Sequence, residues 1–318
     1  MIATAFQYHG LTAYDRQRMS AHQLDWDNQP QFFKSYPGSR IFPLLRPETL
    51  PSCSLRELFE PWSASGASVP VCDLELVSRL LLLTSVITAH SRFDAGEIFY
   101  RSHPAAGALY PIEIYLYGPG FDDLPAGMFH YDVRRPALEQ LGRGSFPAVS
   151  GGTASPTLVL SAVFRRSTWK YRDRAYRYVL LDCGHLLGNL RLALRALGYD
   201  FELVADFSDA AVNRELGFDP DEEAALFLVR IVEENFGKGR PSGDACEKIA
   251  DDVSCTLETV ADESRYPLLE AVQRLTSQSL TPGATSRGRE SDKEPFAVEN
   301  WFPLPGIEAR FSGAGDYV

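Results

Sequence analysis

The sequence predicts a fold in which α-helices and β-strands are mixed around a sizeable core. Its 318 residues include 45% hydrophobic and 23% charged side chains, ordinary values for a globular chain that exclude a wholly disordered protein. The clearest strand is 112–117, where branched apolar residues alternate with Glu and Tyr. The clearest helix is 177–197, where apolar residues recur every three or four positions up to Gly198.

The first 50 residues predict an extended arm laid over the domain. They are polar and aromatic, show no sustained period and contain four prolines. A helix is then expected to begin at Ser54, its N-cap, and a longer core helix is expected over 73–89. Leucines on every side of the longer helix predict burial on most faces. A break at 94–96 follows it.

Two further strands are expected before the long helix, at 127–133 and 157–164. After the long helix we expect a strand at 201–205, a short helix capped by Ser208 and a final strand at 224–232.

The composition changes after Phe236. Turn residues are followed by two amphipathic stretches, 244–260 and 266–277, and then by a linker rich in Ser, Thr, Gly, Pro and charges. This predicts four parts: an N-terminal arm (1–50), a main domain (51–241), a helical extension (242–278) and a linker-like tail (279–318). The tail could be the start of a second domain.

The charge balance and the cysteines limit the class of protein. The chain has 31 Lys and Arg against 42 Asp and Glu, a net charge of −11, which argues against nucleic acid as the partner of a broad basic face. Five scattered cysteines without a CxxC pair indicate a reducing compartment, and six separated histidines indicate no metal site. The longest apolar run is too short for a membrane span and no secretory signal is visible, so we expect a cytoplasmic protein without membrane contact.

Residues 101–111, RSHPAAGALYP, form a loop of small residues between two prolines. Small side chains leave the backbone N–H and C=O groups open to a flat ligand. A tight connection between a helix and a strand would explain the same residues.

Residues 164–178 carry six cations, interleaved with the aromatic side chains of Trp169, Tyr171, Tyr176 and Tyr178. This local patch could attract an anion or stack on single-stranded nucleic acid. The alternative is a solvated loop whose arginines pair with the excess carboxylates of the chain.

Three polar residues, Asp182, His185 and Asn189, share one face of the long helix. Such a strip is typical of a hydrogen-bond network that fixes helix packing, and less often it lines a cofactor pocket. Lys238 and Arg240 flank a glycine and suit either a phosphate clamp or a linker.

Taken in this order, the segments resemble the SagB-type dehydrogenases, the azoline-oxidase branch of the FMN-dependent nitroreductase superfamily. The resemblance runs from about Tyr8 to Pro241 and includes the loop and strand RSHPAAGALYPIEIYLYG and the helix KYRDRAYRYVLLDCGHLLGNL. It implies an α+β fold with a mostly antiparallel sheet covered by helices on both faces. It also implies a homodimer that binds two FMN molecules at the subunit interface.

The resemblance implies which residues hold the flavin. The loop 104–110 would lie along the isoalloxazine ring, and the turn after the long helix would approach the flavin N5 edge. Of the family's Arg-Arg-Ser-x-Arg phosphate segment only a serine and one arginine match, and an alanine replaces the usual loop serine. The cofactor-binding candidates are Ser54, Arg56, Pro104, Ala105, Ala106, Gly107, Ala108, Asn189, Gly198, Tyr199, Lys238 and Arg240.

The resemblance also implies a catalytic pair, Lys170 and Tyr171. Crowding by nearby arginines, Arg166, Arg172 and Arg174, would favour the neutral amine of Lys170, which could act as the base. The expected activity is FMN-dependent oxidation of an azoline-type heterocycle in a modified peptide or a carrier-bound intermediate, in contact with peptide-modifying partner enzymes. The alternatives are a NAD(P)H-dependent nitro or quinone reductase of the same fold and a flavin-poor structural partner in a peptide-modifying complex.

Overall fold

The central sheet has inner strands that are buried along most of their length and edge strands that are largely exposed. In this computed structural model residues 5–15, 22–59, 72–93, 96–121, 123–232, 247–248 and 266–277 are described, all within the first of two units, residues 1–280. The strand order is β1-β6-β5-β4-β7-β9-β8, with β10 also on β6, and each of these pairings is antiparallel. The bounds are β1 Arg40–Pro43, β4 Ile112–Gly118, β5 Gly127–Asp132, β6 Ala137–Arg143, β7 Thr157–Val163, β8 Asp200–Val204, β9 Glu223–Val232 and β10 Glu247–Lys248.

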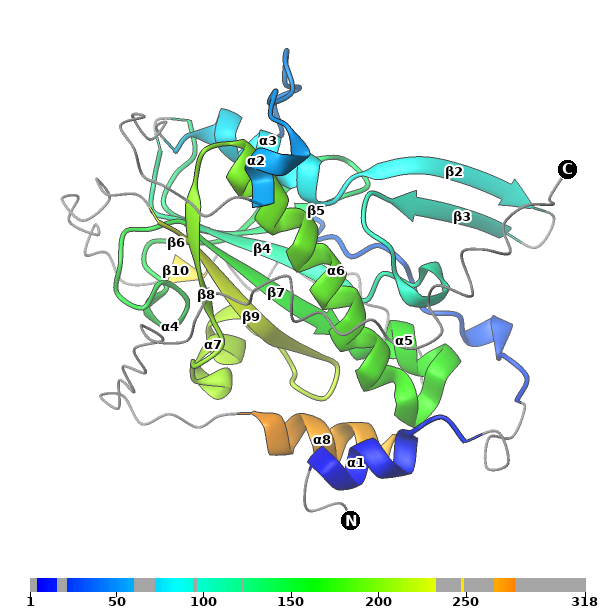
Figure 1. Cartoon of the computed structure of the whole chain (residues 1–318). Helices are drawn as coiled ribbons and strands as arrows, with labels where there is room; N and C mark the ends of the chain where they lie inside the picture. The colour runs from blue at the N-terminus through cyan, green and yellow to red at the C-terminus, as the bar shows by residue number, and fades with distance from the viewer. Residues whose placement is uncertain are drawn as a thin grey trace, which may run out of the picture. The chain divides into compact units, whose positions relative to one another are not determined.

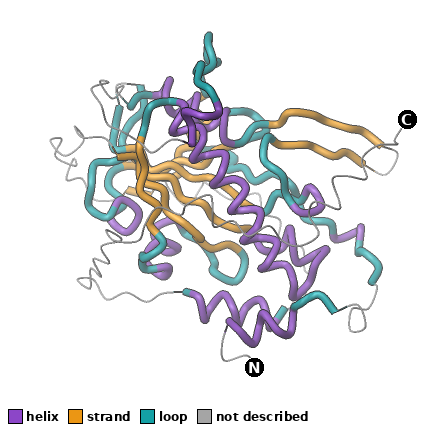
Figure 2. The backbone as a smooth tube through the Cα atoms, in the orientation of Figure 1, coloured by secondary structure: helices purple, strands orange, loops and turns teal. Residues whose placement is uncertain are grey.

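Helices pack on both faces of this sheet (Figures 1 and 2). On one face α3 (Leu74–Thr84) and α6 (Ala175–Ala196) contact the side chains of Ile112, Ile114 and Leu116. On the other face α4 (Pro147–Ser150) and α7 (Asp209–Leu216) contact Tyr115 and Tyr117. The α+β fold with an antiparallel sheet is therefore confirmed, and so are the long helix and the Ser208 cap of α7.

The helix expected over 73–89 is shorter than predicted. It ends at Thr84, and Ser85 donates its N–H to the Leu81 carbonyl oxygen as the C-cap. The next residues, rich in β-branched side chains, form β2 (Ile87–Phe93), which pairs with β3 (Gly96–Arg101). This hairpin is a separate sheet that projects from the body of the unit (Figure 1).

The N-terminal arm is only partly extended. Ala5–Thr12 form α1, which packs beside α8 (Pro267–Thr276), and Tyr8 is buried against the core (Figure 1). Arg40–Pro43 add β1 to the edge of the main sheet. The prediction of an extended arm was therefore wrong for α1, which is helical, whereas β1 is extended but is a strand of the main sheet instead of lying over the domain.

Two other expectations need correction. The cationic segment is not a solvated loop: it forms α5 (Phe164–Tyr171) and a single 3-10 turn, Arg172–Arg174. Within the helix expected over 244–260, residues 247–248 form β10, and the remainder lies outside the described residues. The second stretch does form a helix, α8, and the short helix after Ser54 is α2 (Leu55–Phe59). No helix in the described ranges is long and apolar enough to cross a bilayer.

Candidate active site

A cavity of about 280 Å³ lies where four segments of the chain meet. Its walls are residues 22–33 of the N-terminal arm, the β2–β3 hairpin, the small-residue loop (residues 104–110) and the end of α5. The volume is close to the lower end of ligand pockets, about 300–1,000 Å³, and aromatic walls with few polar groups are typical of them. The lining side chains used below are Trp26, Phe32, Phe33, Phe99, Trp169 and Lys170.

The small-residue loop has an unusual backbone. Gly107, Ala108 and Tyr110 have φ values of 66°, 55° and 47°, in the left-handed region that only glycine adopts easily. Other elements hold it in place, since Arg166 donates from Nη1 to the Tyr110 carbonyl oxygen at 2.9 Å. Strained backbone held by its surroundings is common where a chain positions functional groups.

The predicted catalytic pair lies directly against this loop. A Cβ atom added to Gly107 would lie 2.8 Å from Lys170 Nζ and 2.8 Å from the Tyr171 hydroxyl oxygen. Both side chain tips therefore share the space above one glycine, and Lys170 also lines the cavity. Only glycine leaves room there for both tips.

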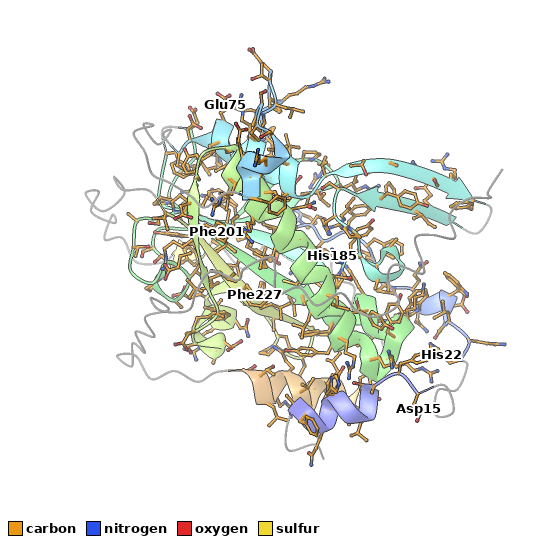
Figure 3. All side chains as sticks on the ribbon, in the orientation of Figure 1. Asp15, His22, Glu75, His185, Phe201 and Phe227 are labelled. Carbon is orange, nitrogen blue, oxygen red and sulfur yellow. The ribbon has the colours of Figure 1, made fainter. Side chains whose placement is uncertain are left out.

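Asp182 supports the loop from the long helix. The Ala106 N–H donates to its Oδ1 at 2.9 Å, whereas the buried Oδ2 has no hydrogen-bond partner in the described part of the chain. Burial raises the pKa of Asp182 to about 6. Of its two neighbours in the predicted polar strip, Asn189 donates to the carbonyl oxygens of Thr84 and Ser102, and His185 is exposed on α6 (Figure 3).

A buried charge network lies behind the loop. Arg166 Nη1 contacts Glu113 Oε1 at 2.5 Å, and Glu113 Oε2 is 3.1 Å from His130 Nε2. Burial would raise the pKa of Glu113, but Arg166, His130 and Arg101 outweigh it and hold that pKa low. This network was missed in the sequence, where the only signal was a glutamate inside an apolar strand.

The same network corrects the expected surroundings of Lys170. Arg166 is fully buried and pairs with Glu113, and Arg174 donates to the Thr12 carbonyl oxygen at 2.6 Å. Two of the three arginines expected to crowd Lys170 are therefore directed to other partners.

The cavity wall does not include four of the remaining predicted cofactor residues, Ser54, Arg56, Gly198 and Tyr199. Ser54, just before α2, and Arg56, in α2, are exposed. The Ser54 hydroxyl accepts the Glu57 N–H, and the Glu57 carboxylate accepts the Ser54 N–H. Gly198 and Tyr199 follow α6 at its far end, about 20 Å along the axis from Asp182. Lys238 and Arg240 lie outside the described residues. Their binding roles remain predictions.

The residues present fit the ring system of a flavin. The backbone from Ala105 to Ala108 carries no side chain larger than a methyl group, and aromatic rings form the neighbouring walls. The polar groups beside this backbone are the carboxylate of Asp182, whose Oδ2 has no hydrogen-bond partner among the described residues, and Nζ of Lys170. Within the described ranges no group of three or more His, Cys, Asp or Glu side chains could hold a metal.

Comparison with known proteins finds a family model, curated relatives and solved structures that are similar to this chain. The model described as the nitroreductase family matches residues 73–231. Trifolitoxin-processing protein TfxB of Rhizobium leguminosarum bv. trifolii is 29% identical over 169 residues, 48% of this chain and 45% of that protein. Microcin B17-processing protein McbC of Escherichia coli is 27% identical over 176 residues, 51% of this chain and 64% of that protein.

A solved structure from Anabaena variabilis, assigned to the nitroreductases, superimposes with a TM-score of 0.65 at 27% identity. The match covers 88% of this chain and 55% of the other. The chain thus spans about half to two thirds of the length of these relatives.

Proposed function

Because the chain belongs to the nitroreductase family, we propose that it is an FMN-dependent dehydrogenase that oxidises an azoline-type heterocycle in a modified peptide or a carrier-bound intermediate. The relatives that process trifolitoxin and microcin B17 confirm the resemblance to the SagB-type branch. The observation that carries the proposal is the convergence of Lys170 Nζ and the Tyr171 hydroxyl on Gly107, at the edge of an aromatic cavity.

The proposed reaction removes two hydrogens from neighbouring ring atoms of the azoline, one as a proton and one as a hydride. When bound, FMN supplies the hydride acceptor. The small-residue loop would hold the flavin ring through its backbone groups, and the aromatic walls would exclude water from it. The protein's own task is then to orient the substrate and to take up the proton.

Lys170 is the proposed proton acceptor. Lys170 lines the cavity and its Nζ lies beside Gly107, another lining residue, and a base must lie within hydrogen-bond reach of the proton that it removes. Burial raises the pKa of Tyr171, with contributions from Tyr178 and Asp182, so its hydroxyl keeps its proton. Tyr171 is therefore the proposed hydrogen-bond donor beside the base.

The test uses the purified chain loaded with FMN and a peptide that contains one thiazoline. Lys170→Ala is expected to lower the rate of thiazole formation by about 10²–10⁴-fold while the flavin absorbance is unchanged. Arg274→Ala, which removes a cation 69% exposed on α8, is the control and should keep the wild-type rate. Loss of flavin together with activity would make Lys170 a binding element, and an unchanged rate would refute its role as the base.

The same preparation separates the other candidates. A nitro or quinone reductase is the second candidate, because aromatic walls suit a flat quinone equally well; it would oxidise NADPH and leave the thiazoline peptide unchanged. A flavin-poor structural partner is the third, favoured by the exposed position of Ser54 and Arg56. A colourless protein that takes up no added FMN would refute both enzyme proposals.

We also propose that the chain forms a homodimer through the outer face of α6. Leu181 is 62% exposed there, and a Cβ atom built on Gly184 or Gly188 would meet no other atom within 4 Å. An exposed apolar side chain beside two glycines allows close approach of another helix. Light scattering of Leu181→Glu should show a shift towards the monomer.

A further inference from the structure

Donors from α5 and β3 hold the N-terminal arm by its backbone. Trp169 donates from Nε1 to the Asp25 carbonyl oxygen at 2.6 Å, and Arg166 donates from Nε to the Gln31 carbonyl oxygen at 2.9 Å. Arg101 donates from Nη2 to the Phe32 carbonyl oxygen at 3.0 Å. Trp169 and Arg166 belong to the cationic and aromatic segment 164–178, which the sequence allows to be either an anion-attracting patch or a solvated loop. In the structure these two side chains instead hold the arm.

A further contact joins the arm to the backbone of α5 at the proposed catalytic pair, Lys170 and Tyr171. His22 Nε2 is 3.0 Å from the carbonyl oxygen of Lys170, so the arm contacts the backbone of the proposed base itself. Arg166 joins two walls of the cavity, because its Nη1 donates to Tyr110 in the small-residue loop while its Nε donates to the arm. The arm is therefore a fixed wall of the site.

This wall is aromatic. Trp26, Phe32 and Phe33 line the cavity, and Trp26 meets Trp169 edge to face with ring centroids 5.2 Å apart. Phe33 packs in the same manner on Phe99 of the hairpin, at 5.0 Å. Although it lines the cavity, Trp26 remains 63% exposed, so a ligand could bury much of its ring.

We propose that this arm wall is the specificity element of the site, with Trp26 as the specificity-determining residue that packs on the five-membered heterocycle of the substrate and on the flat heteroaromatic ring that oxidation makes of it. Planar rings gain from edge-to-face and offset-stacked contacts in addition to the area that they bury. The proposal deepens the proposed function and rests on it for the identity of the ring, an azoline that becomes an azole.

The test measures binding separately from turnover. The probe is a tripeptide whose central residue is a thiazole, titrated by calorimetry into the FMN-loaded chain; the matched ligand carries cysteine in place of the ring. Trp26→Ala is expected to raise the Kd for the thiazole peptide about tenfold, and Trp26→Phe should restore most of the affinity. Phe6→Ala removes an aromatic side chain that is 83% exposed on α1, away from the cavity wall, and should leave the Kd unchanged.

Each outcome decides one of the two claims. A Kd for Trp26→Ala within twofold of the wild type, an equal loss in Phe6→Ala, or no preference of the wild type for the thiazole over the cysteine peptide overturns the specificity proposal. If Trp26→Ala oxidises a thiazoline peptide with an unchanged KM, the proposed function is retained and the specificity role of Trp26 is refuted. If the thiazole peptide binds tightly in a Trp26-dependent manner but no azoline is oxidised, the proposed function is refuted and the proposal that the arm wall determines specificity is supported.

Discussion

Gly107→Ala is expected to damage catalysis far more than stability. The new Cβ would lie 2.8 Å from both Lys170 Nζ and the Tyr171 hydroxyl oxygen, whereas ordinary contact begins at 3.4 Å. Each tip must therefore move by at least 3.4 − 2.8 = 0.6 Å. Because a misplacement of about 1 Å can cost about 10²-fold in rate, we expect kcat for azoline oxidation to fall by about 10–100-fold.

The cost in stability is smaller because the displaced atoms are the ends of flexible side chains. The main cost is the positive φ of 66°, about 1–2 kcal/mol for a residue with a Cβ. For a domain of this size that corresponds to a loss of roughly 2–8 °C in the melting temperature. Gly152→Ala is the matched control: its φ is 74°, yet its new Cβ would meet nothing within 4 Å.

The assay compares thiazoline oxidation and thermal unfolding of both glycine variants with the wild type. Similar melting temperatures for the two variants, with a rate loss confined to Gly107→Ala, would support the placement of the catalytic pair over the loop. Wild-type kcat in Gly107→Ala would refute the reasoning, because the two tips could then not depend on the space above this glycine.

Two further predictions concern buried charges. Glu113→Gln leaves the Arg166 guanidinium buried without its counter-charge, so we expect the free energy of unfolding to fall by about 3–5 kcal/mol in urea at pH 7; a loss below about 1 kcal/mol would contradict the pairing. His103 is buried, and burial, with Arg101 adding to it, lowers its pKa to about 4, so its contribution to stability is complete above pH 6.5 and is lost as the pH falls towards 4. His103→Gln should lack this loss of about 3 kcal/mol, and parallel pH profiles for wild type and variant in urea unfolding would contradict it.

The sequence was sufficient for elements whose pattern is strong. The helix α6 and the strands β4 and β7 carry long runs of apolar residues, and the structure places the two strands at the centre of the sheet with α6 packed on one face. Strand β6 was missed because it contains Glu139 and Gln140, which a polarity pattern assigns to the surface and which are fully buried here. The hairpin β2–β3 was missed because it is mostly exposed and because its first residues, up to position 89, were expected to continue the preceding helix.

The candidate site was predictable in its parts and less so in its assembly. The small-residue loop, Lys170 and Tyr171 were identified from the family pattern, and they do meet in space. The role of Arg166 could not be predicted, because its partner Glu113 lies 53 positions away and the partner carbonyls of the arm belong to residues of no special type. Contacts to backbone atoms leave no trace in the identity of the residue that accepts them.

Attachment of the arm through backbone atoms affects how such a protein can change its substrate. The donors on α5 and β3 hold the arm through the carbonyl oxygens of Asp25, Gln31 and Phe32, which every amino acid provides. Side chains along the arm can therefore be exchanged while its attachment to the domain is kept. A family built in this way can remodel one wall of its cavity by point substitution, without disturbing the loop and the lysine where the chemistry is proposed to occur.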